Sequence, residues 1–157
     1  VLLLPNRKKR GGRMIITNTN LIAYLTIPGD RTPLAKQILQ KDATWVAPQM
    51  WQSEFQNVIA IYLNQGLYTL DEGLEFIQTA KNLMRHGDYQ VASEQVIRLA
   101  HRSKCSAYDC EFVALAQDLG VPLVTSDRKV LTAFPEIAVS LEDFWVDEKN
   151  KNEEEEL

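Results

Sequence analysis

The sequence has few of the residues on which many metal and nucleophilic sites depend. Among 157 residues there are two cysteines and two histidines. Cys105 and Cys110 have no histidine nearby at ligand spacing, so they match neither a zinc knuckle nor a CxxC redox pair, and we expect reduced thiols. His86 and His101 lack a clear partner for a Ser-His-Asp triad. The side chains left for chemistry are therefore mainly oxygen ligands.

Long apolar runs and glycine-rich turns are also missing. No segment approaches the roughly 18 apolar residues of a membrane span, so we expect a cytoplasmic protein without a membrane anchor. The turn "TNTN" at residues 17–20 contains no glycine, which argues against a nucleotide-binding or flavodoxin-like domain. A phosphotransfer domain would need an acid in that turn and a lysine at the end of a late strand, and Lys129 lies beyond that position.

Positive charge is scarce as well. The chain has 17 Lys and Arg against 21 Asp and Glu, a formal net charge of −4, so broad nonspecific coating of DNA is not expected. A nucleic acid would need a local basic patch, for which the candidates are Arg98, Arg102 and Lys104, followed by Arg128 and Lys129. A solvated helix face is the alternative explanation of these charges.

The length of the chain suits one domain with a substantial core. Residues 1–13, "VLLLPNRKKRGGR", place their charges after the apolar stretch, the reverse of a secretory signal. We expect this segment to be a non-native or upstream leader that is disordered, with Met14 as the natural start. The acidic tail at 147–157 is expected to be disordered too, which leaves 14–146 as the domain.

Strand-like and helix-like segments alternate through residues 14–146. Strands are predicted near residues 15, 45, 90, 123 and 139, with helices between them. Such alternation predicts right-handed crossovers and a parallel sheet covered on both faces. We therefore expect an α/β protein, a three-layer α/β/α domain with a central, mostly parallel sheet of about five strands.

Several local patterns mark where the helices begin and end. Caps are predicted at Thr32 and Ser93, and a capping box at Thr69 to Glu72 in "TLDE". Another helix is expected to start at Ser106 and to end at Gly120. Tyr108, Phe112, Leu115, Ala116 and Leu119 form an apolar stripe that is expected to be buried. Leu70, Leu74, Ile77 and Leu83 also follow helical spacing, and they could form a dimer face or pack inside the domain.

Four polar positions are expected to meet at one edge of this sheet. Asn18 and Asp127 follow the carboxyl ends of predicted strands, while Glu54 and Asp109 lie in early turns of helices. Carboxylates brought together raise one another's pKa unless a cation neutralises them. Ligands that are all oxygen select Mg²⁺ or Mn²⁺ over zinc, and such a site catalyses phosphodiester chemistry without a protein nucleophile.

Each acid also has a purely structural explanation. Asp109 lies three residues after Ser106 and could complete a capping box, and Asp127 could start a short helix. Glu54 alone could be a solvated charge on a helix flank. The joint placement of the three acids favours a site, whereas the remaining acids of this region are interpreted as surface charges, namely Glu111, Asp118, Glu136 and Glu142.

At these residues the chain resembles the PIN-domain ribonucleases, most closely the VapC-type toxins of type II toxin–antitoxin pairs. The family pattern of an apolar strand, Asp-Thr-Asn and an apolar helix is similar to "IITNTNLIAYL", with Asn18 in place of the aspartate. Glu54 in "SEFQNVI" matches the second acid. Asp109 and Asp127 in "SAYDCEFVALAQDLGVPLVTSD" match the third and fourth. The resemblance covers 14–146.

The resemblance implies a Mg²⁺- or Mn²⁺-dependent endoribonuclease that cuts RNA and is usually a homodimer. It also implies a VapB-like antitoxin whose C-terminal segment occupies the active-site groove. The implied metal ligands are Glu54, Asp109, Asp127 and Asn18. Asn20 and Thr125 are implied to support these ligands through hydrogen bonds. RNA binding would fall to Arg98, Arg102, Lys104 and Arg128.

Asn18 is where the chain departs from this pattern. An asparagine keeps an oxygen ligand of nearly the same shape but removes one negative charge, so metal affinity should fall. Three origins remain open: an introduced inactivating substitution, a natural variant with weak catalysis, or a binding module descended from a nuclease. We expect a weak or inactive nuclease, and the alternative is a catalytically silent PIN module that binds RNA or a protein partner.

Overall fold

The sheet at the centre of the molecule has four parallel strands. The structure, a computed structural model, describes residues 14–146, and the expected leader at 1–13 and tail at 147–157 lie outside the described residues. The strands run in the order β2-β1-β3-β4, and every neighbouring pair is parallel. Their bounds are β1 Met14–Thr17, β2 Thr44–Val46, β3 Leu123–Val124 and β4 Ala138–Val139. The predicted α/β fold class is confirmed.

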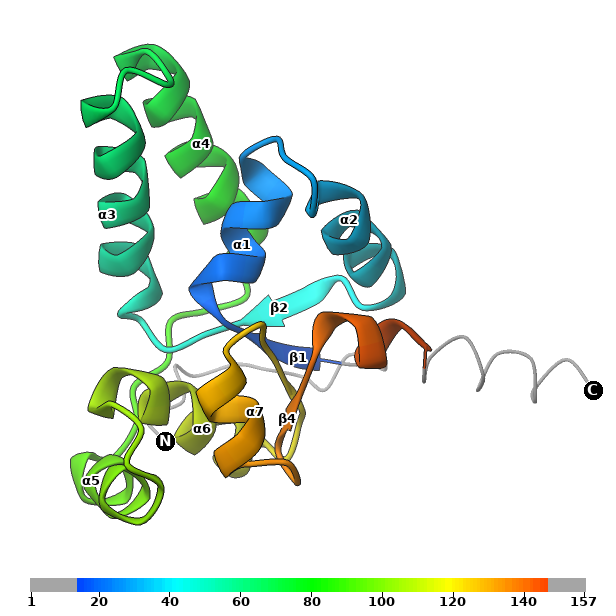
Figure 1. The fold of residues 1–157 in the computed structure, drawn as a ribbon, viewed down its shortest axis with the longest axis vertical. Helices are drawn as coiled ribbons and strands as arrows, with labels where there is room; N and C mark the ends of the chain where they lie inside the picture. The colour runs from blue at the N-terminus through cyan, green and yellow to red at the C-terminus, as the bar shows by residue number, and fades with distance from the viewer. Residues whose placement is uncertain (1–13, 147–157) are drawn as a thin grey trace, which may run out of the picture.

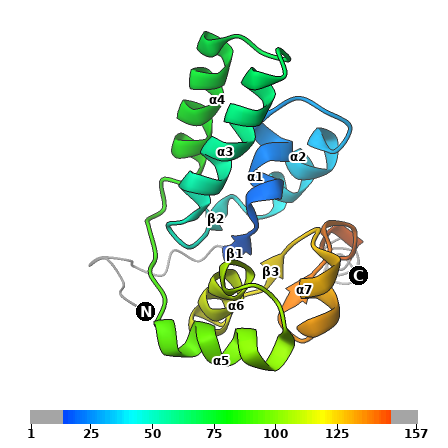
Figure 2. The ribbon, with the colours of Figure 1, turned by 60° about the vertical axis from the view of Figure 1, so that its left-hand side comes forward.

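Helices cover both faces of this sheet. Their bounds are α1 Thr19–Thr26, α2 Thr32–Lys41, α3 Trp51–Asn64, α4 Leu70–Leu83, α5 Ser93–Ser103, α6 Ala107–Leu119 and α7 Arg128–Ala133. In Figure 1, α1 to α4 lie above the sheet and α5 to α7 below it, which gives three layers. Figure 2 shows α3 and α4 side by side as a hairpin that projects away from the sheet.

The core is continuous through the sheet because the interior strands are buried on both faces. Ile15 and Ile16, neighbours on β1, are 1% and 0% exposed although their side chains point to opposite faces. Leu123 and Val124 on β3 are buried in the same way. This pattern is the expected one for parallel strands between two layers of helices. No helix in the described part of the chain has both the length and the hydrophobicity needed to cross a bilayer.

The prediction of a fifth strand, near residue 90, is wrong. The segment near residue 90 makes only an isolated parallel bridge between Pro48 and Tyr89, with a hydrogen bond from Gln49 N to Tyr89 O of 3.0 Å. Proline has no N–H to donate, and the chain turns into α3 directly after Pro48, so the pairing cannot extend into a ladder.

Of the two roles left open for the apolar residues of α4, packing inside the domain does not hold for Leu70 and Leu74. Leu70 and Leu74 are 65% and 55% exposed. The helix instead packs through small residues, since Gly73 is buried and a Cβ added there would lie 3.1 Å from Ile59 Cγ2 on α3. Close approach of the two helices at Gly73 turns the leucines outward. The prediction that Tyr108 of α6 is buried is wrong, because its side chain is exposed.

Predictions of helix boundaries are confirmed where a side chain or glycine fixes the end. The capping box of Thr69 and Glu72 is present, and Gly120 ends α6 in the left-handed conformation with φ 64°. The caps at Thr32 and Ser93 are wrong by one residue, because these residues are the first of α2 and α5. The Thr32 hydroxyl instead donates to Tyr24 O at 2.6 Å.

Candidate active site

A cavity of about 160 Å³ lies at the carboxyl edge of the sheet. The predicted catalytic and supporting residues all line it, namely Asn18, Asn20, Glu54, Asp109, Thr125 and Asp127. The remaining lining comes from Thr19 and from apolar side chains of α6, β3 and α7. Residues that lie more than one hundred positions apart in the sequence therefore meet at one place.

The order of the strands explains why these residues converge. β1 and β3 are neighbours in the sheet, so Asn18 after β1 and Asp127 after β3 leave from the same edge. Glu54 and Asp109 reach this edge from the first turns of α3 and α6. The two central strands and two helix starts thus supply one polar residue each.

Both polar atoms of the Asn18 side chain are bonded to neighbouring groups. Its Oδ1 accepts a hydrogen bond from Leu21 N at 2.9 Å, which caps the start of α1. Its Nδ2 donates to Thr125 Oγ1 at 2.9 Å. Thr125, 1% exposed, also accepts from Asp127 N at 3.1 Å. The threonine hydroxyl therefore joins the chain segments that carry Asn18 and Asp127.

This bonding pattern would accommodate an aspartate at position 18. A carboxylate oxygen caps a helix as well as an amide oxygen does. The Thr125 hydroxyl is the acceptor in both of its bonds, so it could donate its own hydrogen to a carboxylate in place of accepting from the amide. The fold therefore does not require an amide at Asn18.

Glu54 is half-buried and has a specific partner. The Thr19 hydroxyl donates to Glu54 Oε1 at 2.8 Å. Burial raises the pKa of the Glu54 carboxyl above its usual value, the bond from Thr19 lowers it, and the negative charge of Asp109 raises it further. Asp109 and Glu54 are therefore close enough to interact electrostatically, as their shared place in the cavity indicates.

The other two acids differ in how their carboxylates are held. Asp127 Oδ1 accepts from Val130 N at 3.1 Å and caps α7, so the structural explanation of this residue is confirmed. Ser106 Oγ accepts from Asp109 N at 3.0 Å, but no bond in the other direction completes a capping box within residues 14–146. The Asp109 carboxylate has no hydrogen-bond partner in that range and is available to a ligand.

Glu111 is an acid of this region that the sequence interpretation left as a surface charge. Burial raises the pKa of its carboxyl, and the negative charge of Glu54 raises it too. Glu111 follows Asp109 by two positions, about 200° around α6, so it faces away from the Asp109 side. Glu111 lies near Glu54 only because the fold brings α3 and α6 together, and the sequence carried no signal for this.

The donor atoms of the cavity suit a hard divalent cation. Carboxylates and an amide oxygen, without histidine or cysteine, match the ligands that Mg²⁺ and Mn²⁺ prefer. However, no three His, Cys, Asp or Glu side chains between residues 14 and 146 are placed to hold a metal ion together. The donor atoms are of the kind that binds such an ion, whereas the described side chains are not placed around a common point where an ion would sit.

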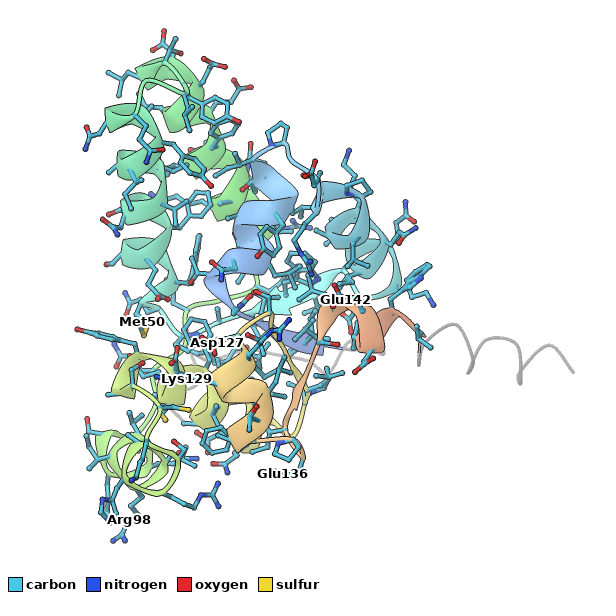
Figure 3. The ribbon with its side chains drawn as sticks, in the orientation of Figure 1. Met50, Arg98, Asp127, Lys129, Glu136 and Glu142 are labelled. Carbon is cyan, nitrogen blue, oxygen red and sulfur yellow. The ribbon has the colours of Figure 1, made fainter. Side chains whose placement is uncertain are left out.

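The basic residues predicted to bind RNA do not line the cavity. Arg98 forms an ion pair with Glu94 at 2.8 Å on the outer face of α5, and both side chains are 77% exposed. Figure 3 shows Arg98 at the lower end of the molecule, pointing away from Asp127. The solvated-face explanation fits Arg98 well.

The other basic candidates lie in three different settings. The Arg102 guanidinium lies over the Phe134 ring, 5.4 Å from its centroid. Lys104 ends α5 with a positive φ of 61°. Arg128 is exposed and begins α7 directly after Asp127, which places it beside the cavity along the chain. Their role in RNA binding stays a prediction, and Arg128 has the most favourable position.

Comparisons with known proteins agree with this fold. The chain is 25% identical over 125 residues to a protein named Ribonuclease VapC3 from Pyrobaculum aerophilum, an alignment that covers 77% of this chain and 95% of that protein. It shares the fold of PAE2754 from Pyrobaculum aerophilum. That crystal structure matches with a TM-score of 0.66 and 15% identity over 88% of this chain and 98% of the other. No family model matches the chain.

Proposed function

We propose that this chain is a PIN-domain endoribonuclease of the VapC type that hydrolyses RNA phosphodiester bonds and is weakened by Asn18. One observation carries the proposal: Glu54, Asp109 and Asp127 line a single cavity together with Asn18. The similarity to a protein named Ribonuclease VapC3 over most of both chains supports it.

The proposed cofactor is Mg²⁺ or Mn²⁺, held by Glu54, Asp109, Asp127 and the Asn18 amide oxygen. A bound divalent ion would polarise a phosphoryl oxygen and supply hydroxide near neutral pH. The contribution of the chain is to hold these oxygens in position: Thr19 orients Glu54, and Thr125 fixes the loop that carries Asp127. Glu54 must lose its proton to act as a ligand, and its raised pKa makes this step sensitive to acid.

The proposed biological setting is that of a cytoplasmic toxin restrained by a VapB-like antitoxin. The exposed Leu70 and Leu74 of α4 provide an apolar surface that a second copy of the chain would cover in a homodimer. Sedimentation of the chain with and without Leu74→Ser tests this assembly, because a dimer formed through α4 should weaken when the leucine becomes polar.

The deciding experiment restores the missing charge with Asn18→Asp. Loss of a group that only supports a metal ligand typically changes metal affinity or activity by about 10- to 100-fold, so restoring a ligand should raise Mn²⁺-dependent cleavage of single-stranded RNA at least about tenfold. Adding Glu54→Gln to the restored chain should remove that gain and serves as the control. Mn²⁺ binding measured by calorimetry without any gain in cleavage would overturn the proposal.

A second candidate is a catalytically silent PIN module that binds RNA or a protein partner. It is favoured by the lack of three acids placed to hold a metal within residues 14–146 and by the neutral side chain of Asn18. Such a module need not bind Mn²⁺ even after Asn18→Asp. Calorimetry on this variant separates the two candidates, because the nuclease requires the ion and the silent module does not.

A further inference from the structure

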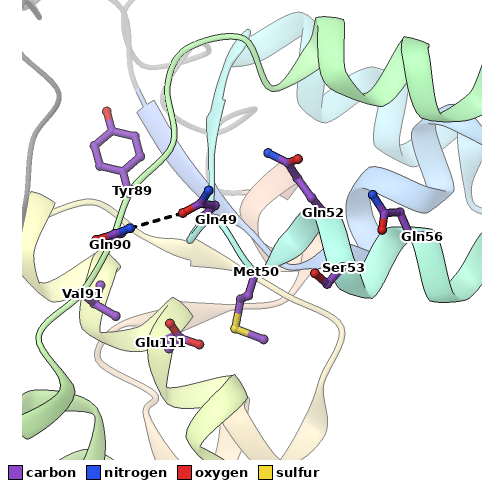
Figure 4. A pocket seen from close by; sticks show the side chains of 9 residues that line it. All are labelled: Gln49, Met50, Gln52, Ser53, Gln56, Tyr89, Gln90, Val91 and Glu111. Carbon is purple, nitrogen blue, oxygen red and sulfur yellow. Dashed lines mark hydrogen bonds between the residues drawn. The ribbon is translucent and has the colours of Figure 1, made fainter.

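A second and larger cavity, of about 500 Å³, lies on the other side of the start of α3. Figure 4 shows its main polar lining, which comes from Gln49, Gln52, Gln56 and Gln90, with Met50 and Glu111 at its lower side. The volume falls within the range of small-molecule sites, about 300–1,000 Å³. The acidic cavity is smaller, at about 160 Å³, and its oxygen ligands suit an ion that binds phosphate, so the two cavities suit different parts of one ligand.

The same two helices form walls of both cavities. On α3, Gln52 and Gln56 are one turn apart and face the larger cavity, while Glu54 faces the acidic one. On α6, Asp109 lines the acidic cavity and Glu111 the larger one. The two cavities therefore adjoin across α3 and α6. A strand with a phosphate at the acids would place a neighbouring nucleotide against the glutamines.

The chemistry of the lining favours a nucleobase over a phosphate. Among the described residues, the cavity has the carboxylate of Glu111 and no Lys or Arg, so an anion would be repelled. Glutamine amides offer a donor and an acceptor side by side, which match the edge of a base such as adenine. The carboxylate of Glu111 only accepts, so it favours the amino group of adenine or cytosine over the carbonyl oxygen that uracil has in that place. Unpaired RNA bases present these edges to side chains, whereas the deep, narrow major groove of an RNA helix keeps the edges of paired bases out of reach.

The glutamines are also able to exchange their present partners for a ligand. Gln90 Nε2 donates to Gln49 Oε1 at 3.4 Å, and Gln52 Nε2 donates to Asp88 Oδ1 at 3.3 Å. Both bonds are longer than the usual 2.7–3.2 Å, and so are weak. Gln56 is exposed and has no hydrogen-bond partner within residues 14–146. Met50 supplies an apolar contact for the face of a ring.

We propose that this glutamine-lined cavity holds one unpaired adenine or cytosine of a single-stranded RNA, next to the phosphate that lies at the acidic cavity. The subsite rests on the proposed ribonuclease function and specifies its substrate: adenine or cytosine, with an amino group where uracil has a carbonyl oxygen, is preferred over uracil beside the cleaved bond.

Equilibrium binding of short RNAs tests the subsite without any cleavage. The probes are fluorescein-labelled hexanucleotides, U6 and two versions in which one central uracil is replaced by adenine or by cytosine, measured by anisotropy in EDTA. Good base contacts change affinity at least about fivefold, so both substituted probes should bind at least that much more tightly than U6. Glu111→Gln should lose the difference, because its amide can also donate to the carbonyl oxygen of uracil. Gln37→Ala, an exposed glutamine on α2, should keep it.

Equal binding of all three probes, or discrimination that survives in Glu111→Gln, would overturn the subsite and leave the cavity to a peptide ligand. Loss of discrimination in Gln37→Ala would also overturn it, because that residue lies outside the cavity. The test is independent of catalysis. If Asn18→Asp fails to cleave RNA while base discrimination persists, the nuclease proposal fails and the base-binding cavity stands.

Discussion

Asn18 should contribute measurably to stability, because its side chain caps α1 and bonds to Thr125. Replacing an N-cap by alanine costs about 1 kcal/mol, and a partly buried hydrogen bond contributes about 1 kcal/mol. Asn18→Ala should therefore lower the free energy of unfolding by about 2 kcal/mol. In a domain of this size the melting temperature should fall by about 4 to 8 °C.

Asn18→Asp should behave differently from Asn18→Ala. The carboxylate keeps the cap, and the Thr125 hydroxyl can donate to it, so only repulsion from neighbouring acids destabilises this variant. That repulsion should decrease as the pH is lowered, because protonation removes the charges. The loss in Asn18→Ala should persist, since it does not depend on charge. Asn20→Ala is the matched control and should lie within about 0.5 kcal/mol of the parent, because Asn20 is exposed.

Urea unfolding in EDTA, followed by the fluorescence of the buried Trp45 and Trp51, measures these differences. A double-mutant cycle between Asn18→Ala and Thr125→Val should give a coupling of about 1 kcal/mol. The bonding described for Asn18 is refuted if Asn18→Ala is as stable as the Asn20→Ala control. It is equally refuted if Asn18→Asp loses as much as Asn18→Ala at every pH.

Two further expectations concern charges around the cavity. The pKa of Glu54 is raised on folding, so its contribution to stability is present below the unfolded pKa near 4.5 and is lost as the pH rises through the raised value. Glu54→Gln should therefore gain stability relative to the parent between pH 4 and pH 7 in EDTA, and urea midpoints that do not diverge over this range would contradict the assignment. Arg128→Glu should weaken binding of the U6 probe and reduce its salt dependence, because Arg128 follows Asp127 at the cavity. Arg98→Glu should change neither, and equal effects of the two variants would show that Arg98 also contacts RNA.

The sequence was sufficient for features that depend on one short segment. Short apolar runs located the four strands, and Thr69 with Glu72 located the start of α4. The convergence of Asn18 with Asp127 followed from strand polarity alone, since residues after parallel strands leave from the same edge.

Features that depend on how helices meet were not predictable in this way. Leu70 and Leu74 have the spacing of a buried stripe, yet the close approach of α3 at Gly73 decides which side of α4 is covered. Glu111 lies beside Glu54 because the fold brings α3 and α6 together, and neither helix sequence indicates this. Gln49, Gln52 and Gln56 do show a polar stripe by spacing, but its partner Gln90 comes from the segment that was predicted as a strand.

The shared use of α3 by two cavities restricts how the chain can change length. Inserting or deleting one residue between Gln49 and Gln56 would rotate the following side chains by about 100°, and both Glu54 and the glutamine face would lose their positions at once. The turn between α3 and α4, by contrast, lies at the far tip of the hairpin (Figure 2), where extra residues would leave both cavities intact. Variation in length among related chains should therefore accumulate at that tip and be absent from the first two turns of α3.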